Sequence, residues 1–143
     1  TAIGLDLQAL GGMQLMVDGK RVLPQDSLGY KGMMLSSVPN LANVFGYTNA
    51  SWTLKSDLTS QYVCRLLNHM AKTGVRQCTP TLTDASVKPE RWVDFSSGYI
   101  QRSLDRFPQQ GSKAPWRLHQ NYVLDLLSLK FGRLDDGAMV FSR

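Results

Sequence analysis

The sequence KGMMLSSVPNLANVFGYTNASWTLK, residues 31–55, holds the pattern that decides the fold. An apolar run at residues 41–45 predicts a buried strand, and Pro39 favours an extended backbone just before it. Gly46 then opens a turn, and helical spacing begins at Leu54. A turn at the carboxyl end of a strand is where open α/β sheets bind ligands. The stretch therefore predicts an α/β fold with a ligand site at this turn.

A long amphipathic helix is predicted to follow the turn. Its apolar residues recur at every fourth position, as Leu54, Leu58, Tyr62, Leu66 and Met70, joined by Val63 and Leu67. This spacing places them on one face of a helix of about 22 residues, roughly 33 Å long. Asn49 or Ser51 can cap its first turn through a side-chain oxygen, and Gly74 can end it with a positive φ. Cys64 borders this stripe and is predicted to be a buried thiol.

The apolar stripe requires a large apolar partner. Burying one leucine-sized side chain contributes about 1.5–3 kcal/mol, so seven such groups imply an extensive packed surface. The short strands predicted elsewhere supply little sheet for it. The chain also starts with Thr1 in an apolar stretch, without a polar leading segment. Both observations predict that part of the protein lies upstream of residue 1.

Short elements are predicted on both sides of the long helix. Asp18-Gly19 separates two runs at 13–17 and 20–23 and favours a type I′ hairpin, because both turn residues need positive φ. Further strands are expected at 1–5, 32–35 and 139–141, and helices at 97–106 and 118–131, the last ending at Gly132.

Composition limits the function classes. The 143 residues are 43% hydrophobic, which is enough for a core, and the net charge of +5 is spread along the chain. A spread excess favours solubility over a dedicated nucleic-acid surface. Cys64 and Cys78 form no CxxC pair, which is typical of a reduced, cytoplasmic chain, and no run of 18 apolar residues predicts a membrane span.

Several motifs resemble one enzyme family. YKGMMLS at 30–36 and VPNL at 38–41 are similar to the FAD-containing monooxygenases, although Ser37 stands where glycine is more usual. GYTNASWTLK at 46–55 and GSKAPWRLHQNY at 111–122 look like the Baeyer–Villiger branch. TAIG at 1–4 stands at the family's Ala-Thr-Gly strand, with isoleucine in place of threonine. The chain therefore resembles the C-terminal part of such an enzyme.

The resemblance implies an α/β fold in two parts. Residues 1–75 would be the C-terminal portion of a three-layer ββα FAD/NAD(P)-binding domain, with a strand, a hairpin and a strand-turn-long-helix unit. Residues 76–143 would be a mixed, mainly helical C-terminal extension packing on the body. The expected partner is the missing N-terminal portion of the same enzyme.

The resemblance also implies a flavin-dependent, NADPH-using monooxygenase. A C4a-peroxyflavin would convert a ketone to an ester or oxygenate sulfur or nitrogen in a small-molecule substrate. The positive end of the long helix and its free N–H groups would stabilise negative charge on reduced FAD. The implied cofactor-binding residues are Gly46, Tyr47, Thr48, Asn49, Ala50, Ser51 and Trp52, and the substrate-cavity candidates are Thr53 and Lys55. A solvated surface position is the simpler alternative for Lys55.

The phosphate-binding and catalytic parts of such an enzyme are absent from the sequence. No GxGxxG fingerprint occurs, and neither does the family's His- and Trp-containing fingerprint or its upstream arginine. No catalytic residue is therefore expected in this chain. The chain by itself is expected to bind neither FAD nor NADPH tightly and to be inactive.

Two other interpretations stay open. The chain could be a stand-alone basic α+β module that binds a protein or a nucleic acid, or an interaction fragment without chemistry. The residues available for phosphate or nucleic-acid binding are Arg102, Arg106, Lys113, Trp116 and Arg117, for which a solvated or domain-packing surface is the simpler explanation. His69 and His119 lack partners at metal-ligand spacing, and Asp135-Asp136-Gly137 lacks the further acidic ligands of a calcium loop. No metal site is predicted.

Overall fold

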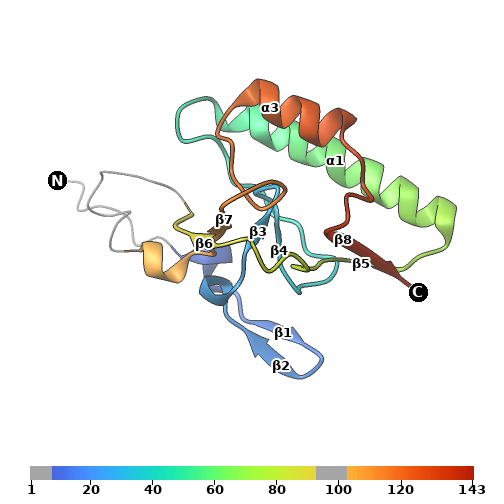
Figure 1. Ribbon diagram of the computed structural model, residues 1–143, viewed down its shortest axis with the longest axis horizontal. Helices are drawn as coiled ribbons and strands as arrows, with labels where there is room; N and C mark the ends of the chain where they lie inside the picture. Colours follow the sequence, from blue (N-terminus) through green and yellow to red (C-terminus); the bar gives the residue numbers. More distant parts are fainter. Residues whose placement is uncertain (1–7, 93–102) are drawn as a thin grey trace.

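The computed structural model describes residues 8–92 and 103–143 and is a mixed α/β structure (Figure 1). The strand predicted at 1–5 and most of the helix predicted at 97–106 lie outside the described residues. Within them, one long helix and a shorter helical segment lie side by side, and four two-stranded antiparallel sheets lie below and beside them.

A β-hairpin opens the described chain after a 3₁₀ turn at Ala9–Gly12. Strand β1 (Leu15–Val17) pairs with β2 (Lys20–Val22) through Asp18 and Gly19, whose φ angles are 49° and 76°. Positive φ at both turn residues suits a hairpin because its twist then matches that of the strands. The predicted hairpin is confirmed.

The other sheets join distant parts of the chain, apart from one local pair. Strand β3 (Gly29–Tyr30) pairs with β4 (Met34–Leu35). Strand β4 lies inside the predicted strand at 32–35, whereas β3 falls in a region without a predicted strand. Strand β5 (Gln77–Pro80) pairs with the C-terminal β8 (Met139–Ser142), which confirms the predicted terminal strand. Strand β6 (Pro89–Glu90) pairs with β7 (Gln110–Gly111), and further 3₁₀ turns lie at Pro24–Asp26 and Leu104–Arg106.

The strand predicted at 41–45 is wrong. Residues 41–45 form a loop. Backbone hydrogen bonds from this region go to two different segments and do not follow one strand ladder. The Asn43 N–H donates to the Met33 carbonyl at 2.7 Å, while the Asn40 N–H donates to the Cys78 carbonyl at 3.0 Å. The Asn40 side-chain oxygen accepts from the Cys78 N–H at 2.9 Å. Apolar composition alone did not reveal that none of residues 8–92 and 103–143 pairs with this segment as a strand.

Helix α1 (Trp52–Thr73) has the predicted length of 22 residues and ends at Gly74, whose φ is 71°. Ser51 occupies the N-cap position, but its hydroxyl bonds the Thr53 hydroxyl at 2.7 Å and caps no backbone N–H. Leu58, Tyr62 and Leu66 are buried, whereas the stripe residues Leu54 and Leu67 are exposed. Cys64 is also exposed, so its predicted burial is wrong.

One core spans both predicted parts of the chain. Buried residues before position 75, among them Tyr30, Leu58 and Tyr62, share a cluster with Trp116 and Leu129 beyond it. The described residues after position 75 include four short strands as well as short helical segments. The boundary at 75/76 therefore stays a prediction, and the two parts pack as neighbours.

A second helical segment lies beside α1 (Figure 1). It consists of α3 (Tyr122–Leu126) and a π-helical turn, η4 (Leu127–Phe131). It begins later than the predicted 118, because the Asn121 side chain caps it by accepting from the backbone N–H groups of residues 123 and 124 at 3.0 and 3.2 Å. The Arg65 side chain joins the two helices by donating to the backbone carbonyls of Leu129 and Gly132.

A buried tyrosine pair lies under α1. The Tyr30 and Tyr62 hydroxyls are 3.0 Å apart, and the Tyr30 hydroxyl donates to Asp136 at 2.7 Å. Burial raises the pKa of both phenols, that of Tyr62 from 10.0 to about 12.

This pair predicts alkaline destabilisation. Between about pH 10 and 12 the unfolded chain releases the Tyr62 proton while the folded chain keeps it. The free energy of unfolding is therefore expected to fall as pH rises through that range, because the folded state then binds more protons. Urea unfolding measured at several pH values checks this. An unchanged slope in Tyr62→Phe would show that this phenol is not responsible.

Candidate functional site

The predicted cofactor turn lies at the start of α1 and is only partly buried. Gly46 and Tyr47 are buried, whereas residues 48–52 are exposed. A Cβ atom on Gly46 would lie 2.2 Å from the Trp52 ring, so the close approach of that ring requires glycine here. The rings of Trp52 and Phe45 lie 5.7 Å apart. The indole thus folds back over the turn that precedes its own helix.

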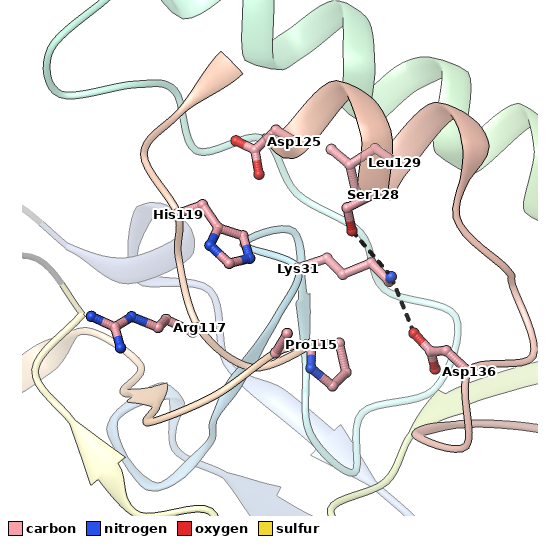
Figure 2. Close-up of a pocket in the computed structure, with 9 residues that line it drawn as sticks. Lys31, Pro115, Arg117, His119, Asp125, Ser128, Leu129 and Asp136 are labelled. Atoms are coloured by element: carbon pink, nitrogen blue, oxygen red, sulfur yellow. Dashed lines mark hydrogen bonds and ion pairs between the residues drawn. The ribbon is translucent and has the colours of Figure 1, made fainter. Parts of the chain in front are cut away.

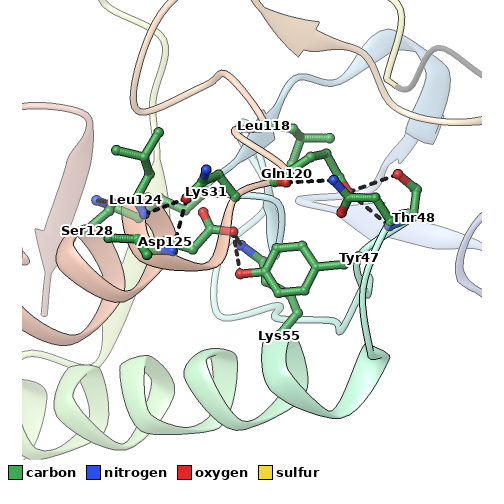
Figure 3. Close-up of polar contacts among 12 residues, drawn as sticks. Lys31, Tyr47, Thr48, Lys55, Leu118, Gln120, Leu124, Asp125 and Ser128 are labelled. Atoms are coloured by element: carbon green, nitrogen blue, oxygen red, sulfur yellow. Dashed lines mark hydrogen bonds and ion pairs between the residues drawn. The ribbon is translucent and has the colours of Figure 1, made fainter.

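Gln120, which is 72 positions from Thr48 in the sequence, holds the turn in place (Figure 3). Its side-chain oxygen accepts from the Thr48 backbone N–H at 2.9 Å and from the Thr48 hydroxyl at 3.1 Å. The Asn49 side-chain amide donates to the Gln120 carbonyl at 3.2 Å. Because the Thr48 N–H is already bonded, the N–H groups that remain available at this turn belong to later residues.

Asp125 holds the next part of the turn. Its Oδ2 atom accepts from the Tyr47 hydroxyl at 2.7 Å and lies 2.9 Å from the Lys55 Nζ (Figure 3). The Lys55 and Asp125 side chains are only 5% and 8% exposed. Burial lowers the pKa of Lys55 and the Asp125 carboxylate opposes that shift, while burial and the same carboxylate raise the pKa of Tyr47. Lys55 is therefore a buried ion-pair partner. The alternative of a solvated surface position is wrong, and the predicted place in a substrate cavity stays a prediction.

A second, partly buried pair repeats this arrangement. The Lys31 Nζ lies 3.1 Å from Asp136 Oδ2, the atom that also accepts from the Tyr30 hydroxyl. Lys31 further lies 3.5 Å from the Ser128 hydroxyl and above the Tyr62 ring. Each carboxylate thus accepts from one lysine and one tyrosine. These partners matter most at Asp125, because a buried charge without them would be costly.

A cavity of about 240 Å³ lies between the two pairs (Figure 2). Lys31, Asp125, Ser128 and Asp136 line it, and the exposed residues Arg117 and His119 line it as well. Among the described residues, no group of three His, Cys, Asp or Glu side chains is arranged to hold a metal ion. The two carboxylates that line this cavity form ion pairs with lysines, Asp125 with Lys55 and Asp136 with Lys31.

The alternative basic surface is not gathered at one place. Trp116 is buried and packs edge-on against Tyr30 at 5.6 Å. Lys113 pairs with Asp84 at 2.7 Å. Arg117 lines the cavity, and Arg102 lies outside the described residues. Because Trp116 is buried, the described members of this set offer no exposed aromatic ring for base stacking.

The first turn of α1 keeps hydrogen-bonding capacity for a ligand. In residues 8–92 and 103–143, no group accepts a hydrogen bond from the backbone N–H groups of Asn49, Ala50, Ser51 or Trp52. A helix of 22 residues carries about half a positive charge at this end. These donors suit an anionic or electron-rich group, which is the kind of group that the resemblance to FAD-containing monooxygenases implies here.

Gln120 and Asp125 were missed by sequence reasoning. Asp125 is 78 positions from Tyr47, and Gln120 is 72 positions from Thr48. The GSKAPWRLHQNY motif includes Gln120 but carries no local signal that its amide reaches the turn. Only the folded chain brings these residues together.

Comparisons with known proteins support the same class. Over its whole length the chain resembles a C-terminal part of the FAD-containing monooxygenases, at 41–46% identity. It is 46% identical over 143 residues to FAD-containing monooxygenase EthA of Mycobacterium tuberculosis and 44% identical to EthA of Mycolicibacterium smegmatis. It is 42% identical over 145 residues to the protein named "Probable FAD-binding monooxygenase AlmA" of an Acinetobacter species.

The chain corresponds to less than a third of the length of these relatives. The matches cover 100% of this chain but only 29% of the length of each of these relatives. No protein-family model matches the chain, and no solved structure matches it significantly. The predicted resemblance to FAD-containing monooxygenases is confirmed, and the activity of a whole enzyme is a matter for proposal.

The Asp125 contact predicts a large stability effect. Asp125→Asn is expected to lower the free energy of unfolding by about 3–5 kcal/mol, because it leaves the Lys55 ammonium buried without a counter-charge. Chemical denaturation measures this loss. Adding Lys55→Met removes the stranded charge and should recover most of it.

Asp84→Asn is the matched control. Asp84 also pairs with a lysine, at 2.7 Å, but both side chains are about half exposed at 50% and 49%. The free energy of unfolding should fall far less in Asp84→Asn than in Asp125→Asn, because water screens exposed ion pairs. Equal losses for the two variants would contradict the importance of burial at Asp125.

Proposed function

We propose that this chain is the C-terminal part of a flavin-dependent, NADPH-using monooxygenase and that residues 46–52 contact the flavin ring of FAD. The proposal rests mainly on one observation. The N-terminal end of α1 offers uncommitted backbone N–H groups, in a segment that resembles FAD-containing monooxygenases throughout. The exposed contacts of Gln120 and the buried contacts of Asp125 support it by fixing the turn before any ligand binds.

The residues divide the work at this site. Ala50, Ser51 and Trp52 would direct N–H groups and the positive helix end at the electron-rich edge of the flavin. Gly46 and Tyr47 would hold the backbone of the turn in place, with Thr48 and Asn49 fixed by Gln120. FAD supplies the oxygen-activating chemistry when bound.

The substrate and the rest of the enzyme belong to the same proposal. The full protein would oxygenate a small ketone to an ester, or oxygenate sulfur or nitrogen, with NADPH as reductant. Thr53 is exposed beside the turn and remains a candidate for the substrate cavity. Lys55 would affect the site indirectly, by holding the Asp125 carboxylate that binds Tyr47 of the turn. No catalytic residue is assigned to this chain, and the chain alone would be inactive.

The fold and setting extend the proposal. Residues 1–75 would complete a three-layer ββα FAD/NAD(P)-binding domain, and residues 76–143 would pack on it. No helix among the described residues is long and apolar enough to cross a membrane. A cytoplasmic location stays a prediction.

The backbone N–H of Ser51 offers a direct test. Its φ of −61° already suits proline, so Ser51→Pro removes this N–H without forcing a new φ. In the full-length polypeptide, purified with its bound flavin, Ser51→Pro is expected to lower the midpoint potential of FAD. A hydrogen bond to a charged group contributes about 1.5–3 kcal/mol, so reduced FAD should lose about tenfold or more in relative affinity.

Ser51→Ala is the control, because it removes the hydroxyl and keeps the N–H. Its FAD potential should stay at the wild-type value. Equal potentials in all three proteins would contradict contact between this turn and the flavin ring. A full-length product without flavin absorbance would overturn the proposed enzyme class itself.

A further inference from the structure

The helical segment α3–η4 exposes large apolar residues on the side that faces away from the core, where a free surface helix would carry polar residues. Five large apolar side chains on it are exposed, from 39% for Tyr122 to 67% for Phe131. The others are Val123, Leu124 and Leu127. We call these five residues the outer face.

The inner face of the same segment is partly polar. It buries the Asp125 carboxylate together with Leu129, and the Ser128 hydroxyl lies near Lys31. A surface helix usually turns apolar residues inward and polar residues outward. A helix that is apolar on its outer side as well is normally covered on both sides.

We propose that the outer face packs against the upstream part of the same polypeptide, so that α3–η4 is sandwiched between that part and α1. This inference rests on the proposed function, since it requires the longer protein. The chain covers 29% of the length of its relatives, so most of a protein of that size is available to cover this face.

The position of the outer face supports this occupant. Gln120 lies just before α3, and Asp125 lies within it, so the segment is tied directly to the proposed flavin turn. A cofactor at that turn would need protein around it, and α3–η4 carries an uncovered apolar surface next to the residues that hold the turn. Docking there would fix the turn and the remainder of the FAD site relative to each other.

A membrane surface is a poorer match for the outer face. Interfacial helices combine an apolar face with a strongly charged one, rich in lysine and arginine. The ten residues of α3–η4 contain one cation, Lys130, and one anion, Asp125, which is buried in a pair with Lys55. No described contact points to a second copy of the chain.

Cysteine accessibility tests the proposal in the native full-length polypeptide. Leu127→Cys and Phe131→Cys are introduced separately with Cys64→Ser, because Cys64 is exposed and Cys78 is buried. Met16→Cys is the control, since Met16 is 59% exposed on the β1–β2 hairpin, at the opposite end of the view in Figure 1. Peptide mass spectrometry measures the rate of maleimide labelling at each site, scaled to the unfolded protein.

The two outer-face sites are expected to react at least about tenfold more slowly than the control, because labelling would require local opening of the interface. Rates equal to that of Met16→Cys would overturn the proposal. So would protection that appears only with phosphatidylglycerol vesicles, which would indicate a membrane, or only at high protein concentration, which would indicate a second copy.

Two further measurements keep the outcome clear. If the cysteine variants do not fold, hydroxyl-radical footprinting of Tyr122 and Phe131 in the unsubstituted protein replaces them, with oxidation at the level of the unfolded protein as the contrary result. Flavin absorbance of the same samples is read separately. Bound flavin with fast labelling overturns the docking alone, whereas protected sites without flavin overturn the proposed function alone.

Discussion

Two carboxylates, one buried and one partly buried, each accept from a lysine ammonium and a tyrosine hydroxyl and hold the C-terminal segment against residues 30–55. Asp125 joins Tyr47 to Lys55, and Asp136 joins Tyr30 to Lys31. A buried charge is tolerated only when its partners are in place, so these contacts leave the segments little freedom to separate. The turn before α1 and the cavity beside it depend on this arrangement.

The same constraint supports the proposed binding surface at the start of α1. A helix terminus is common, and its dipole alone specifies no ligand. In this chain the turn is fixed by Gln120 and Asp125 from outside its own helix, while the N–H groups of residues 49–52 stay uncommitted. Binding energy at such a site is not spent on ordering the loop.

The outer face of α3–η4 connects the described structure with the proposed upstream part of the polypeptide. Its inner side satisfies polar groups and its outer side offers Leu127 and Phe131 to a partner. The segment would thus contribute to two interfaces, one with α1 and one with the upstream part of the protein. Such a role accounts for a short helix that is apolar where a free helix would be polar.

Local patterns in the sequence predicted the elements that depend on neighbouring residues. The hairpin follows from Asp18-Gly19, α1 from its four-residue spacing, and the helix end from Gly74, because backbone geometry alone decides these features. The resemblance of residues 30–55 identified the protein class for a similar reason, since those motifs are contiguous.

Tertiary structure decided the features that depend on partners far along the chain. Residues 41–45 have strand-like composition but find no partner strand among the described residues. Lys55 looks like a surface residue until Asp125 covers it. Neither outcome is written in local spacing, because a ladder and an ion pair each need a second segment. The sequence by itself therefore determined the helix, the hairpin and the likeness to flavin monooxygenases, while only folding determined which side chains hold the candidate site.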